Sequence, residues 1–445
     1  MDIEKIQYDI MLIVTQILQS SSDDIGMLHP LLAKMGVVLS EISDVDVDTM
    51  ENIAAGETNT SLGLAVSPVI AAKCLQDIAR TRCFIQGIKQ AIDDKLSDNN
   101  GSVQILYAGT GPYGLLLLPL LLIYKNAPLS ITLMDIHHTS IKAVKKVIKA
   151  LELEPLVKSI ELTDATQWQP EKGLSFDIII SETMKNALKK EPQLFIFAHL
   201  QQFLKPQGIL IPESINLSAW LTNTGSELRQ RLGEQVDFLP IKIADFYQYN
   251  KNAAAQLNQQ GIACLKSEWQ IPAFSKKHRD LKLSTDIQVY QQHQLKEFQS
   301  DLTCNENFFE CKLQPGKKLY FDYKMQPEPH FSWTSELLEI DFNLPELTDI
   351  GRLNVLGIKR LWKKSQLDRQ QLLDQKIKQA EWQKDLALMD CLGIALENWM
   401  KFLYQTVDFF EFEDWLERNS AKIIDESVRA HIKKTLLGAT EKQLS

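Results

Sequence analysis

Cysteine is scarce in this sequence, with six residues in 445, and no two of them form a C-x-x-C pair. Structural zinc sites and thioredoxin-like redox sites are built on such pairs, so the spacing argues against both. Scattered single cysteines also differ from the dense disulfide frameworks of small secreted domains. We therefore expect reduced thiols, a cytoplasmic location and no metal site.

An excess of positive charge is missing as well. The 48 lysines and arginines stand against 57 acidic residues, which gives a net charge of −9. A protein that binds nucleic acid through a broad surface needs the opposite balance, so we expect no nucleic-acid partner. The 44% hydrophobic and 24% charged fractions are those of an ordinary globular protein, and the length allows more than one domain.

Long hydrophobic runs are also absent. The longest, Leu115–Ile123, contains a proline and is far shorter than the about 20 residues that cross a bilayer. The first residues, MDIEKIQYDIMLIV, carry acids where a secretory signal carries bases. We expect no membrane partner, and we expect Leu115–Ile123 to be a buried helix.

What the sequence does contain is an ordered alternation of apolar segments. Residues 1–65 show helical periodicity, and one long helix is expected over about 66–100. Short runs of strand character then alternate with helical runs up to residue 212. Such alternation is typical of an α/β fold, in which helices cover both faces of a parallel sheet. We expect a seven-stranded, mostly parallel, Rossmann-like sheet.

Two further regions are expected beyond the α/β domain. Residues 213–350 predict a β-rich, largely antiparallel region for substrate binding or dimerisation, and residues 351–445 predict a helical tail. Within this tail, Asn398–Asn419 carries a cluster of aromatic side chains. They either pack on their own domain or form the contact of a homodimer, because aromatic clusters are enriched at interfaces.

A glycine turn lies in the stretch ILYAGTGPYGLLLL, where Gly109, Gly111 and Gly114 have the spacing G-x-G-x-x-G. Such a turn holds a nucleotide-like ligand only when a strand precedes it and a helix follows. Here the strand VQILYA precedes it and the leucine run follows. The next strand, ITLMD, ends in Asp135, where a carboxylate can bind both hydroxyls of a ribose. These features fit a dinucleotide and S-adenosylmethionine alike.

The segment FDIIISETMKNALKKEPQLFIFAHLQQFLKPQGILIP resembles the double-glutamate loop of the protein arginine methyltransferase family. In that family a strand ends in Ser-Glu, a second Glu follows nine residues later, and a helix leads to L-K-P-x-G. Here Ser181 and Glu182 end the strand, Glu191 stands at the same spacing, and LKPQG completes the pattern.

An upstream segment, CLQDIARTRCF, resembles the helix whose arginine holds the cofactor carboxylate in the same family, with Asp77, Arg80 and Thr81 at matching places. Together with the glycine turn, the matches keep the family's order over residues 74–212, about a third of the chain. The resemblance implies S-adenosylmethionine as cofactor and a class I methyltransferase domain over residues 66–212.

The residues that this resemblance and the motifs assign to the cofactor site are Arg80, Tyr107, Ala108, Gly109, Gly111, Asp135, Ile136, Asp164, Ala165 and Ser181. Asp164 and Ala165 follow a third strand, SIEL. In methyltransferases an acid at this place accepts from the adenine amino group. The alternative for Asp164 is an ordinary solvated acid at a strand end.

Glu182 and Glu191 are the candidate catalytic residues. Methyl transfer from a sulfonium is an in-line displacement, so catalysis consists mainly of positioning and of charge placed near a nucleophile that becomes cationic. Two carboxylates joined by a loop can converge on one nitrogen, and paired carboxylates suit a guanidinium. The alternative is that both are ordinary surface acids. Lys189 and Lys190, in the same run, are expected to be solvated.

The sequence departs from the family mainly where the family binds its substrate. SLGLAVSPVIAA replaces the tyrosine-bearing segment before the arginine-containing helix. The Thr-His-Trp loop is not recognisable, and PEPHFSW, with His330 and Trp333, is its nearest candidate. Ile105 and Tyr107 also stand where the family's cofactor motif has an acid and its first glycine.

Three hypotheses follow from this pattern of matches and departures. The first is N-methylation of an amine or guanidine of a small-molecule metabolite held by the two glutamates. The second is a protein arginine methyltransferase with a divergent pocket, so that the nitrogen nucleophile belongs to a peptide. The third is a non-catalytic, cofactor-binding scaffold subunit.

Overall fold

The computed structural model describes residues 3–46, 54, 56–98, 101–309, 311, 313–326 and 328–335. The chain divides into two compact units, Met1–Glu336 and Leu337–Ser445. The fold described below is that of the first unit. The predicted helical tail and its aromatic segment lie outside the described residues.

Two N-terminal helices, α1 (Ile3–Gln19) and α2 (Ile25–Ser43), form as the periodicity predicted. They pack against each other and against α4 (Ile78–Asp98) and α5 (His138–Leu151). By length and composition α2 is apolar enough to cross a membrane. Its buried face nevertheless belongs to the core of the unit, since Leu28 and Met35 are fully buried there.

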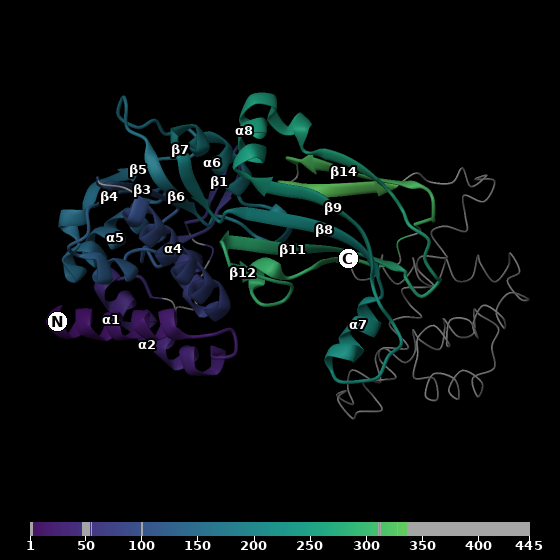
Figure 1. Cartoon of the computed structure of the whole chain (residues 1–445), viewed down its shortest axis with the longest axis horizontal. Coiled ribbons are helices and arrows are strands. Elements are labelled where there is room, and N and C mark those ends of the chain that lie inside the picture. The colour runs from purple at the N-terminus through teal and green to yellow at the C-terminus, as the bar shows by residue number, and fades with distance from the viewer. Residues whose placement is uncertain are drawn as a thin grey trace, which may run out of the picture. The chain divides into compact units, whose positions relative to one another are not determined.

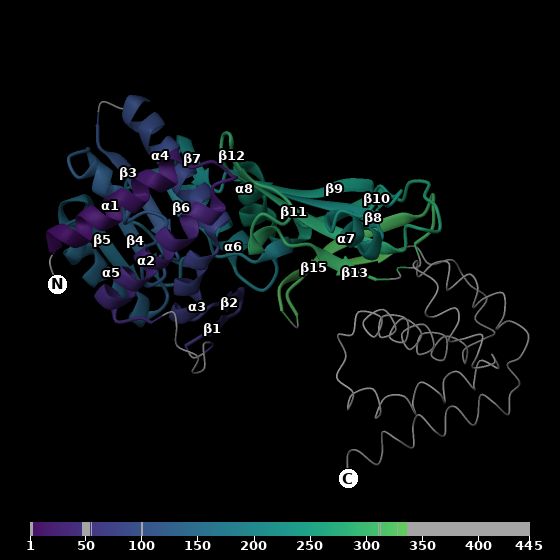
Figure 2. The ribbon, with the colours of Figure 1, turned by 90° about the horizontal axis from the view of Figure 1, so that it is seen from below.

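A β-hairpin follows, where the sequence predicted only helical periodicity. Strands β1 (Thr58–Thr60) and β2 (Gly63–Ala65) pair in antiparallel register. The Thr60 hydroxyl donates to the Gly63 carbonyl at 2.8 Å, which closes the turn. Gly63 has φ +147°, a conformation that residues with a side chain rarely adopt, so glycine permits the hairpin. Figure 2 shows it beside α3 (Pro68–Lys73).

The single long helix predicted from residue 66 is broken into three pieces: α3, the 3₁₀ turn η1 (Cys74–Gln76) and α4. Asp77 is the cause, because it is extended (φ −78°, ψ 90°) and its Oδ1 accepts the Arg80 N–H at 3.0 Å. Short polar side chains compete with the helix backbone in this way and start a new helix.

The α/β part contains a parallel five-stranded sheet in the order β5-β4-β3-β6-β7. As predicted, the first strand of this sheet, β3, is central. The bounds of the strands are β3 (Val103–Ala108), β4 (Leu129–Asp135), β5 (Val157–Leu162), β6 (Phe176–Ser181) and β7 (Leu204–Ile211). All of β6 and nearly all of β3 are buried, as expected of strands covered on both faces.

Two details of the predicted α/β domain are wrong. The sheet has five strands within the described residues, not seven, and the next strand, β8 (Ser214–Thr222), pairs with β9 and β11 in a separate sheet. The leucine run is buried but is not an α-helix: turns lead into a 3₁₀ helix, η2 (Leu120–Tyr124). Pro119 explains this, since it lacks an N–H and its ring clashes with the preceding turn of a helix.

The β-rich region is antiparallel, as predicted. One sheet has the order β12-β11-β8-β9, with β13 on β11, and another has the order β10-β14-β15. Phe246 of β9 stacks on Phe321 of β14 with ring centroids 4.0 Å apart, so side chains from the two sheets share a core. Figure 1 shows these long strands beside the parallel sheet. The bounds are β9 (Ile241–Asn250), β10 (Lys266–Gln270), β11 (Asp280–Tyr290), β12 (His293–Leu295), β13 (Glu306–Phe308), β14 (Lys318–Lys324) and β15 (His330–Ser335).

The remaining helices connect the strands. They are η3 (Glu154–Leu156), η4 (Asn186–Leu188), α6 (Gln193–Leu200), η5 (Gln201–Phe203), α7 (Thr224–Arg231), α8 (Lys251–Gln260), η6 (Gly261–Cys264) and η7 (Asp301–Thr303). Helix α4 packs closely on β11, where a Cβ on Gly87 would lie 2.7 Å from Val289 Cγ1. The α/β and β-rich parts therefore form one body.

Candidate functional site

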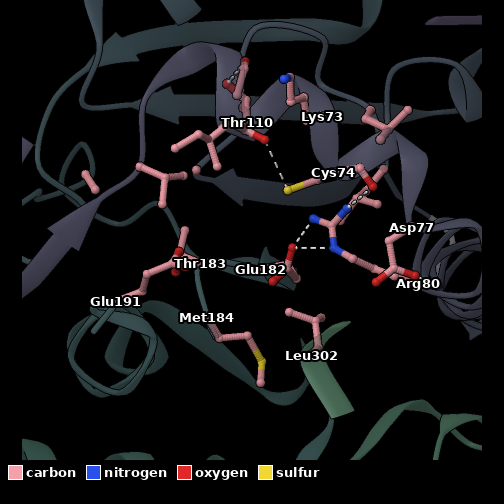
Figure 3. A pocket seen from close by; sticks show the side chains of 18 of the residues that line it. Lys73, Cys74, Asp77, Arg80, Thr110, Glu182, Thr183, Met184, Glu191 and Leu302 are labelled. Atoms are coloured by element: carbon pink, nitrogen blue, oxygen red, sulfur yellow. Dashed lines mark hydrogen bonds and ion pairs between the residues drawn. The ribbon is translucent and has the colours of Figure 1, made fainter. Parts of the chain in front are cut away.

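A pocket of about 670 Å³ lies at the carboxyl ends of β3, β4, β5 and β6. In open α/β sheets ligands bind at this edge. The other walls are formed by the α3–η1–α4 segment, by the β1–β2 hairpin and by residues 298–302 and 304 of the β-rich region. Residues far apart in the sequence thus enclose one space (Figure 3).

Most of the residues predicted from the sequence line this pocket. They are Arg80, Tyr107, Gly109, Gly111, Asp135, Ile136, Asp164, Ala165, Glu182 and Glu191. Ala108 and Ser181 do not line it, because both are fully buried in the sheet. Ser181 instead supports the wall, since its carbonyl accepts the Gln193 side-chain amide at 3.2 Å. A residue at the end of a strand can face either the pocket or the core. The sequence pattern did not distinguish these two orientations.

The glycine turn has the conformation that its sequence implies. Gly109 and Gly111 have φ +75° and +59°, so a side chain at either position would strain the backbone. A Cβ on Gly109 would also collide with Thr183, the residue after Glu182. The turn therefore lets the end of β6 approach the end of β3, which brings the glutamate loop to the glycine turn.

Asp135 is oriented by the backbone of the pocket wall. Its Oδ2 accepts the Gly111 N–H at 2.9 Å and its Oδ1 accepts the His137 N–H at 2.8 Å. The side chain is 7% exposed, and that exposed part faces the pocket. Each carboxylate oxygen can accept more than one hydrogen bond, so the group can still receive ligand hydroxyls.

Two buried polar atoms beside Asp135 have no hydrogen-bond partner in the described part of the chain. They are His137 Nε2 and Ser140 Oγ, and both residues line the pocket. Buried polar groups are almost always satisfied in folded proteins, by protein, water or ligand. The orphaned atoms therefore fit a polar ligand next to the Asp135 carboxylate.

Asp164 lines the pocket but is engaged by its own turn. Its Oδ1 accepts the N–H of Thr166 at 2.9 Å and the Thr166 hydroxyl at 2.7 Å. An aspartate that closes a turn after a strand needs no ligand to explain it. The local role is therefore sufficient for Asp164, and the adenine contact stays a prediction.

Arg80 and Glu182 form an ion pair inside the pocket (Figure 3). The guanidinium donates from Nε to Glu182 Oε2 at 2.6 Å and also from Nη2 to the same oxygen. Its Nη1 donates to the Cys74 carbonyl at 3.2 Å. The two side chains are only 8% and 4% exposed. The arginine predicted to hold a cofactor is thus joined to a glutamate predicted to hold an acceptor, and sequence reasoning missed this link.

The Glu191 carboxylate differs from that of Glu182 in having no hydrogen bond or ion pair within the described residues. It lines the pocket apart from the Arg80–Glu182 pair (Figure 3). Burial raises the pKa of Glu191 to about 7, against the weaker opposing influence of the positive charges on Lys185 and Arg80. At neutral pH this carboxyl group can therefore either hold or accept a proton, as a general base must.

The candidate for the substrate-closing loop, PEPHFSW, contributes no side chain to the described pocket lining. His330 and Trp333 do not line the pocket: His330 Nδ1 lies 2.7 Å from the Glu328 carbonyl, and Trp333 packs on Phe308. The β-rich region contributes residues 298–302 and 304 instead. S-D-L-T at Ser300–Thr303 is a capping box that marks a short helix, but no local signal gave its position in space.

Asp77 joins that loop to the arginine helix. Besides the Arg80 N–H, it accepts the Ser300 hydroxyl at 2.6 Å and the Asp301 N–H at 3.0 Å on Oδ2. The Lys189 side chain is not solvated as predicted, because it pairs with Glu306 of β13. The first contact holds Asp77, which lines the pocket, against the β-rich region, and the second holds the loop that carries Glu191.

No protein-family model matches the sequence, and a search of curated proteins finds no matching sequence. Solved structures that resemble parts of the chain include the following two. The Trypanosoma brucei PRMT1 enzyme-prozyme heterotetrameric complex with AdoHcy is 17% identical, with 57% of this chain and 87% of that chain covered and a TM-score of 0.37. Arabidopsis thaliana Protein Arginine Methyltransferase 10, in an open conformation, is 13% identical, with 56% and 86% covered and a TM-score of 0.39. At such values of identity and TM-score, the likeness assigns neither a ligand nor an activity to this chain.

Proposed function

We propose that this chain is an S-adenosylmethionine-dependent methyltransferase that N-methylates an amine or guanidine group of a small-molecule metabolite. The observation that carries the proposal is the convergence of Gly111, Asp135, Glu182 and Glu191 on one pocket at the carboxyl edge of the parallel sheet. The first two residues suit a nucleoside, and the last two suit a nitrogen nucleophile.

The cofactor fits the residues that the pocket offers. Asp135 presents a carboxylate for ribose hydroxyls, and the unpartnered His137 Nε2 and Ser140 Oγ lie on the same side. Arg80 uses only part of its N–H donors on Glu182 and Cys74, so it can also hold a carboxylate. When bound, S-adenosylmethionine would supply the electrophilic methyl group.

The glutamates would then position and deprotonate the acceptor. Arg80 binds Glu182 only through Oε2, so Oε1 is available to accept an N–H from the acceptor nitrogen. An amine or guanidine is protonated at neutral pH, so its nitrogen must lose one proton to offer a lone pair to the methyl group. The products are then the methylated cation, S-adenosylhomocysteine and one released proton. Glu191, with its pKa raised to about 7 by burial, is suited to take that proton.

Two observations favour other hypotheses. The double-glutamate spacing itself favours a protein arginine methyltransferase with a divergent pocket. The Arg80–Glu182 pair favours a cofactor-binding scaffold, because it occupies two residues that a catalyst needs. We favour the small acceptor because the substrate-side segments of the family are replaced here, notably by the β1–β2 hairpin at the pocket wall.

The test is methyl transfer from S-adenosylmethionine labelled in its methyl group. The chain is incubated with a small-molecule cell extract, with arginine-rich peptides, or with neither. We expect label in a small-molecule fraction. Label in the peptides would establish the second hypothesis. Binding of S-adenosylhomocysteine without transfer to either would establish the scaffold, and absence of binding would refute all three.

A further inference from the structure

The β1–β2 hairpin lies directly against the backbone that carries Glu191. The Leu64 N–H donates to the Lys190 carbonyl at 2.8 Å. Gly63 is buried, and a Cβ there would lie 2.7 Å from Lys190 O and 3.0 Å from both Glu191 C and Pro192 N. Real Cβ atoms essentially never approach backbone so closely. The contact therefore requires glycine at position 63.

The loop that this hairpin touches is strained. Ala187, Leu188 and Lys190 have φ +54°, +53° and +67°, in the left-handed region that residues with side chains avoid. The Glu191 N–H donates to the Lys189 carbonyl at 2.8 Å, which closes a three-residue turn around Lys190. A γ-turn with positive φ at its centre is rare and strained. Such residues persist only when their surroundings hold them in place.

The surroundings hold the loop from two sides. The β-rich region supplies one set of contacts: Thr285 Oγ1 accepts the Ala187 N–H at 2.9 Å, and the Tyr323 hydroxyl donates to the Leu188 carbonyl at 2.9 Å. The Pro329 carbonyl accepts the Lys190 N–H at 2.6 Å. On the other side, the Leu64 N–H of the hairpin donates to the Lys190 carbonyl. Both backbone polar groups of the residue before Glu191 are thus fixed.

We propose that the β1–β2 hairpin is the positioning element for Glu191, and that Gly63 is the positioning residue through which it acts. By pressing on the Lys190–Pro192 backbone it keeps the strained turn closed and the Glu191 carboxylate inside the pocket. This inference deepens the proposed function, because it concerns the glutamate assigned there to the acceptor. Thr60 and Leu64 of the hairpin line the pocket and complete the wall beside it.

A displaced Glu191 would change its protonation. Burial is the main cause of its raised pKa, and the charged or titratable groups that face it are Lys185 on its own loop, Arg80 of α4 and the Cys74 thiol. The hairpin, TNTSLGLA, contributes no titratable side chain. A change in the hairpin can therefore alter the pKa of Glu191 only by moving it or exposing it to water.

The experiment is a pH titration of the full chain, with glutamate side-chain carboxyl carbons labelled for NMR. The Glu191→Gln variant assigns the carboxyl group that titrates near pH 7. Gly63→Ala should lower the pKa of that group by at least about one pH unit, toward its ordinary value, because the carboxylate gains solvent. Gly56→Ala is the matched control: Gly56 also has a positive φ (+90°), but a Cβ there meets only Pro68 Cδ, at 3.6 Å.

A second variant keeps the test sharp if Gly63→Ala unfolds the chain. Thr60→Val preserves shape but removes the hydroxyl that donates to the Gly63 carbonyl and accepts the Leu62 N–H. It should lower the same pKa by a smaller amount. An unchanged Glu191 pKa in folded Gly63→Ala, or in Thr60→Val when Gly63→Ala does not fold, would overturn the proposal. This titration needs no cofactor. Failure of S-adenosylhomocysteine to bind would therefore refute the proposed function but not the proposal that the hairpin positions Glu191.

Discussion

The Arg80 guanidinium and the Glu182 carboxylate, which are 102 residues apart in the sequence, form a buried ion pair that joins α4 to the end of β6. Both residues line the same pocket as Gly109 of the glycine turn. A ligand carboxylate that binds Arg80 must share it with Glu182. The two halves of the site are therefore coupled through a single side chain.

Removal of Arg80 should destabilise the protein strongly. Arg80→Ala leaves the Glu182 carboxylate buried without its partner, and breaking a buried pair in this way costs about 3–5 kcal/mol. Urea unfolding measures the loss. The control is Lys146→Ala, which breaks an ion pair with the exposed Asp44 and should cost much less, because exposed ion pairs contribute little to stability. Equal losses in the two variants would show that the Arg80 pair does not support the fold.

Asp135→Asn should weaken the binding of S-adenosylhomocysteine. The variant keeps the shape of the side chain but removes the charge, and a hydrogen bond to a charged group contributes about 1.5–3 kcal/mol. Such a loss corresponds to at least about a tenfold increase in Kd, measured by calorimetry. Asp164→Ala is the comparison, and it should have a smaller effect because Asp164 is engaged by Thr166. A larger loss of affinity in Asp164→Ala than in Asp135→Asn would show that Asp135 does not bind the ribose.

Glu191 should make stability depend on pH in a defined direction. Burial raises its pKa in the folded state from the ordinary value of 4.5 to about 7. Between these values the folded state binds more protons than the unfolded state, so the contribution of this group falls as pH rises. Glu191→Gln carries no charge to bury, and it should be more stable than the unmodified chain at pH 8 by on the order of 1–3 kcal/mol. The difference should vanish near pH 4. The measurement is urea unfolding of both proteins at each pH. A difference in the free energy of unfolding that does not change between pH 4 and pH 8 would contradict the assignment.

Sequence reasoning succeeded where the signal is local. The strand that ends at Ala108 and the strand that ends at Asp135 have apolar runs of the right length, and the glycine turn between them has a fixed spacing. Glu182 was predicted because the Ser-Glu at the end of another such strand, β6, resembles the double-glutamate loop. In a parallel sheet all these ends meet at one edge, so their convergence on a pocket follows from the strand order.

It failed where one side chain or a distant contact decides the structure. A single extended residue, Asp77, divides the predicted long helix, and Pro119 prevents an α-helix in the leucine run. The β1–β2 hairpin is too short and polar to give a periodic signal. The Arg80–Glu182 pair depends on the tertiary fold, and no spacing rule connects residues so far apart.

The most direct test of the account is single-turnover methyl transfer by Glu182→Gln, with saturating labelled S-adenosylmethionine and the acceptor identified from the labelled fraction. The amide keeps the shape but removes the charge that offsets the cation formed on the acceptor nitrogen. Loss of one such electrostatic group lowers the rate by about 10²–10³. Thermal unfolding should show that the variant is folded at the assay temperature. Calorimetry should show that S-adenosylhomocysteine still binds, with an affinity that is unchanged or higher, because Arg80 no longer shares its charge with a carboxylate at position 182. We predict that the rate of methyl transfer falls by this factor while the cofactor still binds. An undiminished rate would contradict the claim that the paired glutamates hold the acceptor.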